Sequence, residues 1–127
     1  MITGNEYRQR IARLKPNVYM GGKPVDRFDP RLVGGINVMA ATYDFAFDPT
    51  FKEVGVATSH LTGEKINRFC HIHQGVEDLL NKQKMTRLYS QEVGGCIQRC
   101  MGIDALNGIS IVSYEADQKY GTKYYEN

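Results

Sequence analysis

Apolar residues recur every three or four positions in the N-terminal half of the chain, and this spacing predicts two amphipathic helices. The first follows Thr3 and Glu6, which have the spacing of a capping box, and it ends before Pro16. The second lies between Gly34-Gly35 and Asp48-Pro49, and Pro49 is suited to open one short further turn. Their apolar positions are Tyr7, Ile11 and Leu14 in the first helix, and Ile36, Met39, Ala40, Tyr43 and Phe47 in the second.

The helical pattern is strongest from Gly75 onward, and we expect one long helix to run through Cys100. Gly94-Gly95 and Gly102 interrupt the pattern, and each can kink a helix or admit close packing. A last helix covers residues 103–116, with Gly121 as its C-terminal stop. The apolar face of the long helix consists of Val76, Leu79, Leu80, Met85, Leu88, Tyr89, Val93, Cys96, Ile97 and Cys100.

Two short segments have strand character instead. Residues 17–28 alternate weakly around Gly21-Gly22, and residues 54–70 alternate on both sides of a turn at residues 61–64, so each predicts a β-hairpin. The tail, residues 117–127, is polar and rich in tyrosine, which is typical of a linker into a further domain. The predicted fold class is therefore mainly α, with two short β-hairpins.

Composition narrows the class of protein. The chain has 127 residues, which suits one domain, and no apolar run is long enough to cross a membrane. The net charge is +2 with both signs interspersed, so a nucleic-acid partner is not expected. The N-terminus resembles neither a signal peptide nor a transit peptide, and three cysteines do not make a disulfide framework. We expect a cytoplasmic location with reduced thiols.

Cys96 and Cys100 are the main candidates for chemistry. Residues four apart on a helix are neighbours about 6 Å apart, so the two thiols would lie side by side as two ligands of an iron–sulfur cluster whose other ligands lie outside the chain. Arg99 between them is a cation that can lower a thiol pKa. Two alternatives remain: cysteines packed as small hydrophobic residues, and a zinc site completed by Cys70 or His73.

The other polar and aromatic candidates have structural interpretations. We expect His71 and His73 to be hydrogen-bonded at a strand–helix junction, and His60 to be an exposed turn residue. The glycine pairs match no phosphate-binding loop. Four tyrosines on helical stripes are expected in the core, and three basic residues on a solvated helix face. These are Tyr7, Tyr43, Tyr89 and Tyr114, and Lys82, Lys84 and Arg87.

Several segments resemble one family in order along the chain. The most specific is Cys96-Ile97-Gln98-Arg99-Cys100-Met101-Gly102-Ile103-Asp104-Ala105. The others are Leu61 to Phe69 followed by His71 and His73, Tyr114 to Thr122, Asn17-Val18-Tyr19 and Thr42-Tyr43-Asp44. Together they are similar to the 4-hydroxybutyryl-CoA dehydratase and vinylacetyl-CoA delta-isomerase branch of the flavin-dependent 4-hydroxyphenylacetate 3-monooxygenase superfamily.

The resemblance implies two cofactors, FAD and a [4Fe-4S] cluster held by three cysteines and one histidine. Cys96 and Cys100 match the first two cysteines, whereas the third cysteine and the histidine come from later in the family's chain and have no match here. Gln98 matches the family's glutamine, either as a residue that lines the site or as a packing residue. The whole chain, 1–127, would then be the N-terminal helical domain of an acyl-CoA-dehydrogenase-like flavoprotein, without the flavin-binding β domain and the C-terminal helical domain.

The resemblance also implies an activity. The full-length enzyme would dehydrate 4-hydroxybutyryl-CoA to crotonyl-CoA and isomerise vinylacetyl-CoA by a radical mechanism, with a cluster iron as Lewis acid. Its partners would be an acyl-CoA substrate, the remaining domains and further copies in a homotetramer, and this chain alone would be inactive. The alternatives are a flavin-dependent aromatic hydroxylase domain, a class that lacks the two cysteines, and a non-catalytic helical or zinc-binding module.

Overall fold

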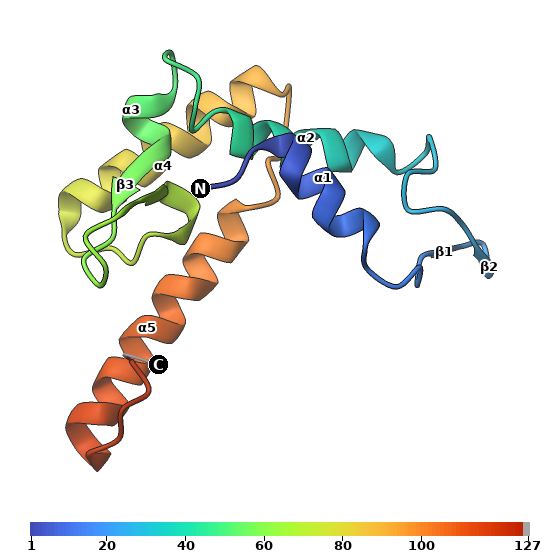
Figure 1. Cartoon of the computed structure of the whole chain (residues 1–127). Helices are drawn as coiled ribbons and strands as arrows, with labels where there is room; N and C mark the ends of the chain where they lie inside the picture. The colour runs from blue at the N-terminus through green and yellow to red at the C-terminus, as the bar shows by residue number, and fades with distance from the viewer. Residues whose placement is uncertain (126–127) are drawn as a thin grey trace.

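Two helical groups and one projecting helix make up the fold (Figure 1). The computed structural model describes residues 1–125. Helix α1 (Gly4–Ala12) packs across α2 (Val33–Asp44), and the hairpin of β1 (Tyr19–Met20) and β2 (Lys23–Pro24) lies between them in sequence. A second group contains α3 (Lys52–Gly55), β3 (Val56–Thr58), β4 (Lys65–Asn67), the 3-10 helix η1 (Arg68–Cys70) and α4 (Val76–Glu92). Helix α5 (Cys100–Tyr120) extends away from both groups.

Helix α1 begins as predicted. The backbone N–H of Glu6 donates to Thr3 Oγ1 at 3.2 Å, and the N–H of Thr3 donates to Glu6 Oε2 at 2.7 Å, which completes the capping box. The N–H of Gly4 donates to Asp44 Oδ1 at 2.7 Å, and the rings of Tyr7 and Tyr43 stack at 5.1 Å. These contacts attach the start of α1 to the end of α2.

Both predicted hairpins are confirmed. Strand β1 pairs antiparallel with β2, with Tyr19 opposite Pro24, and the turn uses Gly21 and Gly22 at φ values of 57° and 75°. Strand β3 pairs antiparallel with β4, with Ala57 opposite Ile66. The second hairpin leads directly into η1 and thereby places Arg68 and Phe69 in the core.

The core lies between α3, η1, α4 and the beginning of α5. Its buried members are Val54, Phe69, Met85, Tyr89, Ile97 and Ile103. Tyr89 is a core residue as predicted, and its ring contacts Phe45 at 4.6 Å and Phe69 at 6.0 Å between centroids. The core prediction is wrong for Tyr114, which is 53% exposed on the projecting part of α5.

The expected continuous helix through Cys100 is wrong. Helix α4 ends at Glu92, and residues 93–99 form a loop before α5 begins at Cys100. Gly94 adopts φ 73°, a left-handed conformation that ends a helix, and Gln98 adopts φ 61°. The Gly94-Gly95 pair therefore breaks the helix, although the apolar spacing continues across it.

Helix α5 is longer than the predicted range 103–116, and it ends at Gly121 as predicted, with φ 68°. Beyond it the chain folds back, because the carboxylate of Asp117 accepts the backbone N–H groups of Tyr124 and Tyr125, both at 2.9 Å. Of the predicted linker, residues 117–127, the first four therefore belong to α5 and residues 121–125 lie against that helix. Residues 126–127 lie outside the described part.

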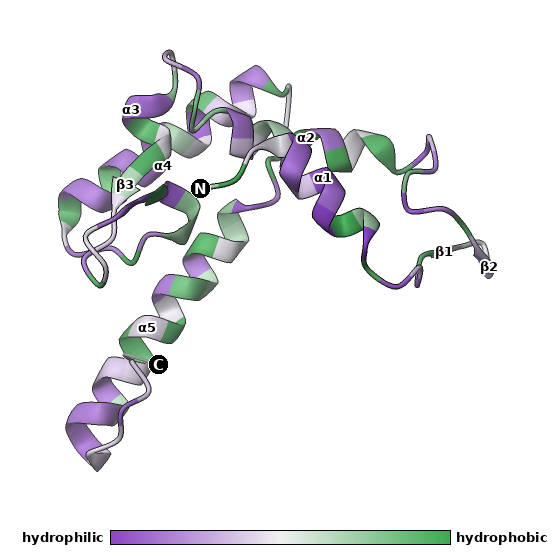
Figure 2. Ribbon diagram, in the orientation of Figure 1, coloured by the Kyte–Doolittle hydropathy of each residue, from purple (hydrophilic) through white to green (hydrophobic). Residues whose placement is uncertain are grey.

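Much of the apolar surface of α5 is uncovered. Figure 2 shows hydrophobic positions along the projecting helix, and Met101, Ile109 and Val112 are each more than 60% exposed. Within residues 1–125, no helix is both long and apolar enough to cross a membrane.

Candidate functional site

The loop that carries the two candidate ligands is sharply bent. The backbone N–H of Arg99 donates to the carbonyl of Ile97 at 2.7 Å, which closes a three-residue γ-turn around Gln98. The positive φ of Gln98, 61°, makes this the rarer and strained form of the turn. Ile97 is 1% exposed and inserts into the core. The turn therefore separates Cys96 from Cys100 by a change of direction rather than by one turn of helix.

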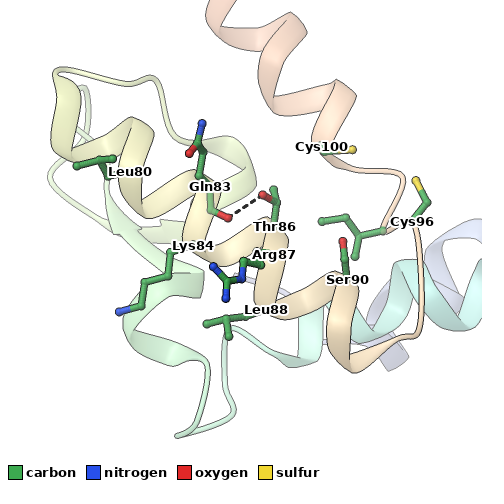
Figure 3. Close-up of a pocket in the computed structure, with 10 residues that line it drawn as sticks. Leu80, Gln83, Lys84, Thr86, Arg87, Leu88, Ser90, Cys96 and Cys100 are labelled. Atoms are coloured by element: carbon green, nitrogen blue, oxygen red, sulfur yellow. Dashed lines mark hydrogen bonds between the residues drawn. The ribbon is translucent and has the colours of Figure 1, made fainter.

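Cys96 and Cys100 nevertheless line the same cavity, of about 830 Å³, between α4 and the start of α5. Figure 3 shows both sulfur atoms at the α5 end of this cavity, which we call the thiol cavity. The thiols were predicted to share one helical face, which is wrong, because only Cys100 belongs to a helix. The other lining residues are Leu80, Gln83, Lys84, Thr86, Arg87, Leu88, Ser90 and Ile97.

The thiol cavity fits thiolate chemistry. The backbone N–H of Gln98 donates to Cys96 Sγ at 3.4 Å, and hydrogen bonds to sulfur stabilise a thiolate ligand. Lys84 and Arg87 bring positive charge to the lining, which contains no carboxylate. An anionic cluster held by thiolates is therefore compatible with the residues present. Among residues 1–125, no three His, Cys, Asp or Glu side chains come together as a metal site, so this chain offers two ligands at most.

Cys70 does not join the pair. It lies with Arg99 and Tyr43 on a second cavity, of about 310 Å³, near the start of α1. The zinc site that Cys70 or His73 would complete with the other two cysteines is not formed in the described part of the chain.

Gln98 is exposed, and its side-chain amide lies over α2. A Cβ built on Gly35 would be 3.6 Å from Gln98 Nε2, so the amide rests against the glycine backbone. Gln98 is absent from the lining of the thiol cavity. Its role as a site-lining residue stays a prediction.

Arg99 is the residue that sequence reasoning underestimated. Its guanidinium lies 4.2 Å from the ring centre of Tyr43 and 4.4 Å from that of Phe69, and it donates to Thr42 Oγ1 at 3.0 Å. Burial lowers the pKa of Arg99, and the neighbouring Tyr43 and Cys70 act in the opposite direction. It lines the second cavity and not the thiol cavity.

The prediction of two hydrogen-bonded histidines is met only in part: among the described residues, the buried His73 Nε2 and His71 Nδ1 have no hydrogen-bond partner. His71 is buried, and its Nε2 lies 3.1 Å from Asp78 Oδ1. Asn107 of α5 donates to the carbonyl of His71 at 3.1 Å and accepts from the backbone N–H of His73 at 2.7 Å. Burial lowers the pKa of His73, with the nearby His71 acting in the same direction. This junction fastens α5 to the chain before α4.

Two further expectations have mixed outcomes. His60 is exposed as predicted, and its Nε2 lies 2.9 Å from the hydroxyl of Tyr125. Lys84 and Arg87 are on an exposed face of α4 as predicted, but the ammonium of Lys82 is only partly accessible and pairs with Asp104 at 2.6 Å. The pair joins α4 to α5 beside the thiol cavity.

Two curated proteins are similar to this chain in sequence. A 4-hydroxybutyryl-CoA dehydratase/vinylacetyl-CoA-Delta-isomerase from Clostridium aminobutyricum is 40% identical over the whole chain, which covers 26% of that protein. The oxygenase component of a 4-hydroxyphenylacetate 3-monooxygenase from Thermus thermophilus is 28% identical over 98% of the chain, which covers 25% of that protein. The chain thus spans about a quarter of the length of these relatives.

Solved structures agree with the sequence comparison. An oxygen-tolerant archaeal 4-hydroxybutyryl-CoA dehydratase from N. maritimus matches 98% of this chain with a TM-score of 0.89 and 36% identity, over 25% of its own length. The oxygenase component of 4-hydroxyphenylacetate 3-monooxygenase, complexed with FAD and 4-hydroxyphenylacetate, matches 72% with a TM-score of 0.62 and 28% identity, over 19% of its length.

The family resemblance seen in the sequence is confirmed by these matches. The family model described as 4-hydroxyphenylacetate 3-hydroxylase N terminal matches residues 3–127. The chain therefore belongs to the 4-hydroxyphenylacetate 3-hydroxylase N-terminal family.

Proposed function

We propose that this chain is the N-terminal helical domain, residues 1–127, of an enzyme that dehydrates 4-hydroxybutyryl-CoA to crotonyl-CoA and isomerises vinylacetyl-CoA. The observation that carries the proposal is the thiol cavity, which both cysteines line although a strained turn separates them. The dehydratase relatives, at 40% and 36% identity, support this activity over the hydroxylase, at 28%.

In this proposal Cys96 and Cys100 are two ligands of a [4Fe-4S] cluster, and the remaining ligands come from other parts of the enzyme. When bound, the cluster would supply a Lewis acid for the leaving hydroxyl, and FAD would accept the electron and hydrogen removed from the substrate. The FAD complex of the monooxygenase component supports a flavin in this family, although no residue of this chain is assigned to it.

The residues of the thiol cavity would support such a ligand pair in three ways. The backbone N–H of Gln98 stabilises the Cys96 thiolate. Lys84 and Arg87 would contribute positive charge to the lining, which favours an anionic cluster. Leu88 and Ile97 make part of the lining apolar, and the apolar surroundings of a metal site influence its solvent access.

The remaining domains of the same enzyme are the proposed partners, together with an acyl-CoA substrate and further copies in a homotetramer. The exposed apolar positions of α5 favour a covering partner, because large uncovered apolar patches on soluble proteins usually mark interfaces.

Cysteine replacement in the full-length enzyme, purified without air, tests the ligand assignment. We expect iron and flavin in the starting protein and loss of iron, with retention of flavin, in Cys96→Ala and in Cys100→Ala. Cys70→Ala is the matched control, because Cys70 lies outside the thiol cavity, and it should keep its iron. Full iron content in the double Cys96→Ala, Cys100→Ala protein would contradict the assignment.

Substrate assays separate the two candidate activities. The proposed enzyme forms crotonyl-CoA from 4-hydroxybutyryl-CoA and leaves 4-hydroxyphenylacetate unchanged. The alternative, a flavin-dependent aromatic hydroxylase, is favoured by the structural match to the monooxygenase component. Hydroxylation of 4-hydroxyphenylacetate by an iron-free protein would establish that alternative instead.

A further inference from the structure

We propose that Arg99 is a positioning residue that holds Cys96 and Cys100 in the geometry needed to bind one centre together. The inference rests on the proposed ligand role of the two cysteines. It adds a function for Arg99, which lies between them in sequence. The side chain of Arg99 lines the second cavity and does not line the thiol cavity.

The loop has few attachments of its own. Gly94 and Gly95 precede Cys96, and both are exposed with nothing within 4 Å of where their Cβ atoms would lie. The backbone bonds that end α4, from Val93 to Tyr89 and from Gly95 to Ser90, stop before Cys96. In the loop, Ile97 lies in the core with Cys100 packed against it, and the Gln98 amide rests on Gly35. Among the described residues, the side-chain hydrogen bond from residues 96–100 to another element is the one that Arg99 donates to Thr42.

The Arg99 anchor joins three parts of the fold. Its guanidinium lies between Tyr43 of α2 and Phe69 of η1, and it donates to Thr42, which is fully buried. Cation–π contacts are stronger where water is excluded, as it is at a partly buried guanidinium. A planar guanidinium can stack on two rings and hydrogen-bond in its plane, which an ammonium cannot do.

Both rings are themselves held in place. Tyr43 stacks on Tyr7 of α1, and Phe69 is 5% exposed and contacts Tyr89. The anchor is therefore rigid, and Arg99 cannot turn without disturbing contacts of both helical groups. No carboxylate pairs with Arg99 among residues 1–125, so its place depends on the aromatic rings and Thr42.

The direction of this anchor determines the direction of the thiols. Arg99 projects toward α2 and η1, and it is the last residue of the γ-turn, directly before Cys100. With Arg99 and Ile97 both pointing into the protein, Cys96 and Cys100 are left to face the thiol cavity. Release of Arg99 would leave the γ-turn free to open and the two sulfur atoms free to separate.

Capture of a trivalent arsenical measures whether the two thiols are held together. Phenylarsine oxide condenses with two thiols: two As–S bonds form, each sulfur loses its proton, and the oxygen leaves as water without any oxidation. The reaction is run on the full-length protein without iron, and peptide mapping assigns the adduct to residues 96–100. Alkylation of the same cysteines by iodoacetamide reports their accessibility one at a time.

We expect Arg99→Met to weaken arsenical bridging by about tenfold, because the second bond depends on the effective concentration of the second thiol. The rate of alkylation of each single thiol should change less than twofold at a temperature where the protein stays folded. Arg99→Lys, which keeps a cation against the rings, should recover part of the loss. Arg8→Met is the matched control, because Arg8 also reaches α2, at Asn37 Oδ1 and 3.0 Å, but from the exposed surface.

If Arg99→Met does not fold, Thr42→Val replaces it, since valine keeps the shape and removes the oxygen that accepts from Arg99. A threefold loss of bridging is then the expected result. Unchanged bridging in the folded variant would overturn the inference, whatever the iron content of the protein. If the unmodified enzyme binds no iron but its bridging still depends on Arg99, the ligand assignment fails and the positioning role stands.

Discussion

The strained turn at Gln98 yields a prediction whose sign can be worked out from the backbone alone. At φ 61°, a residue with a Cβ pays roughly 1–2 kcal/mol for a left-handed conformation. Glycine avoids that cost but loses about 0.5–1 kcal/mol more than alanine through chain entropy on folding. We therefore expect Gln98→Gly to be more stable than Gln98→Ala by about 0.5–1 kcal/mol.

Comparing Gln98→Gly with Gln98→Ala cancels the effects of losing the glutamine side chain. Both variants lose the amide that lies over Gly35, so that contact cancels in the difference. Urea denaturation gives the free energy of unfolding of each variant, and equal slopes show that the unfolded states are comparable. The same pair at Gln83, an exposed position in the middle of α4, is the control. There glycine should be less stable than alanine by about 1 kcal/mol, the opposite sign.

The refuting result is plain. If Gln98→Ala equals or exceeds Gln98→Gly in stability while glycine is less stable than alanine at Gln83, residue 98 does not adopt the left-handed conformation. The γ-turn would then be absent, and the separation of the two cysteines by a change of direction would be wrong.

Three other predictions concern the fold around the site. Gly4→Ala should destabilise the protein by about 2 kcal/mol, because the new Cβ would overlap the carboxylate of Asp44 and lie 2.6 Å from a backbone carbonyl of α2. Tyr89→Phe should stabilise it by about 1–3 kcal/mol, because the Tyr89 hydroxyl is buried without a partner among the described residues, and burial raises its pKa to about 12. His73 is favoured in its neutral form, since burial lowers its pKa below the ordinary 6.5. Stability should therefore be complete above about pH 6.5 and fall as the pH drops toward the lowered pKa, and His73→Gln should reduce that dependence.

Each of these has a measurement and a contradicting outcome. Thermal unfolding reports the first two, and an unchanged midpoint for Gly4→Ala would show that α1 does not approach α2 as described. Loss of stability in Tyr89→Phe would show that the hydroxyl has a partner. For His73, urea unfolding between pH 5 and pH 8 gives the change in the free energy of unfolding with pH. His60→Gln, which alters an exposed ring, is the control. If the free energy of unfolding changes with pH equally in the His73→Gln and unmodified proteins, His73 is not the source of the pH dependence.

Local structure was readable from the residues because neighbours in sequence determine it. The capping box of Thr3 and Glu6, the turn at Gly21 and Gly22 and the stop at Gly121 all depend on contacts within a few positions. The apolar spacing across Gly94 led to the wrong prediction of a continuous helix, because spacing alone does not reveal that the backbone adopts a left-handed conformation there.

The candidate site shows most clearly which features follow from the sequence and which follow from tertiary packing. The residues alone identified Cys96 and Cys100 as a pair, because their types and spacing are written in one short segment, but they placed the pair on a helix. The tertiary structure decided that the two thiols line one cavity from a bent loop and a helix start, and it gave Arg99 its surroundings. The reason is physical: Thr42, Phe69 and Arg99 come together only when α2, η1 and the loop pack, and no local pattern records contacts made over such separations.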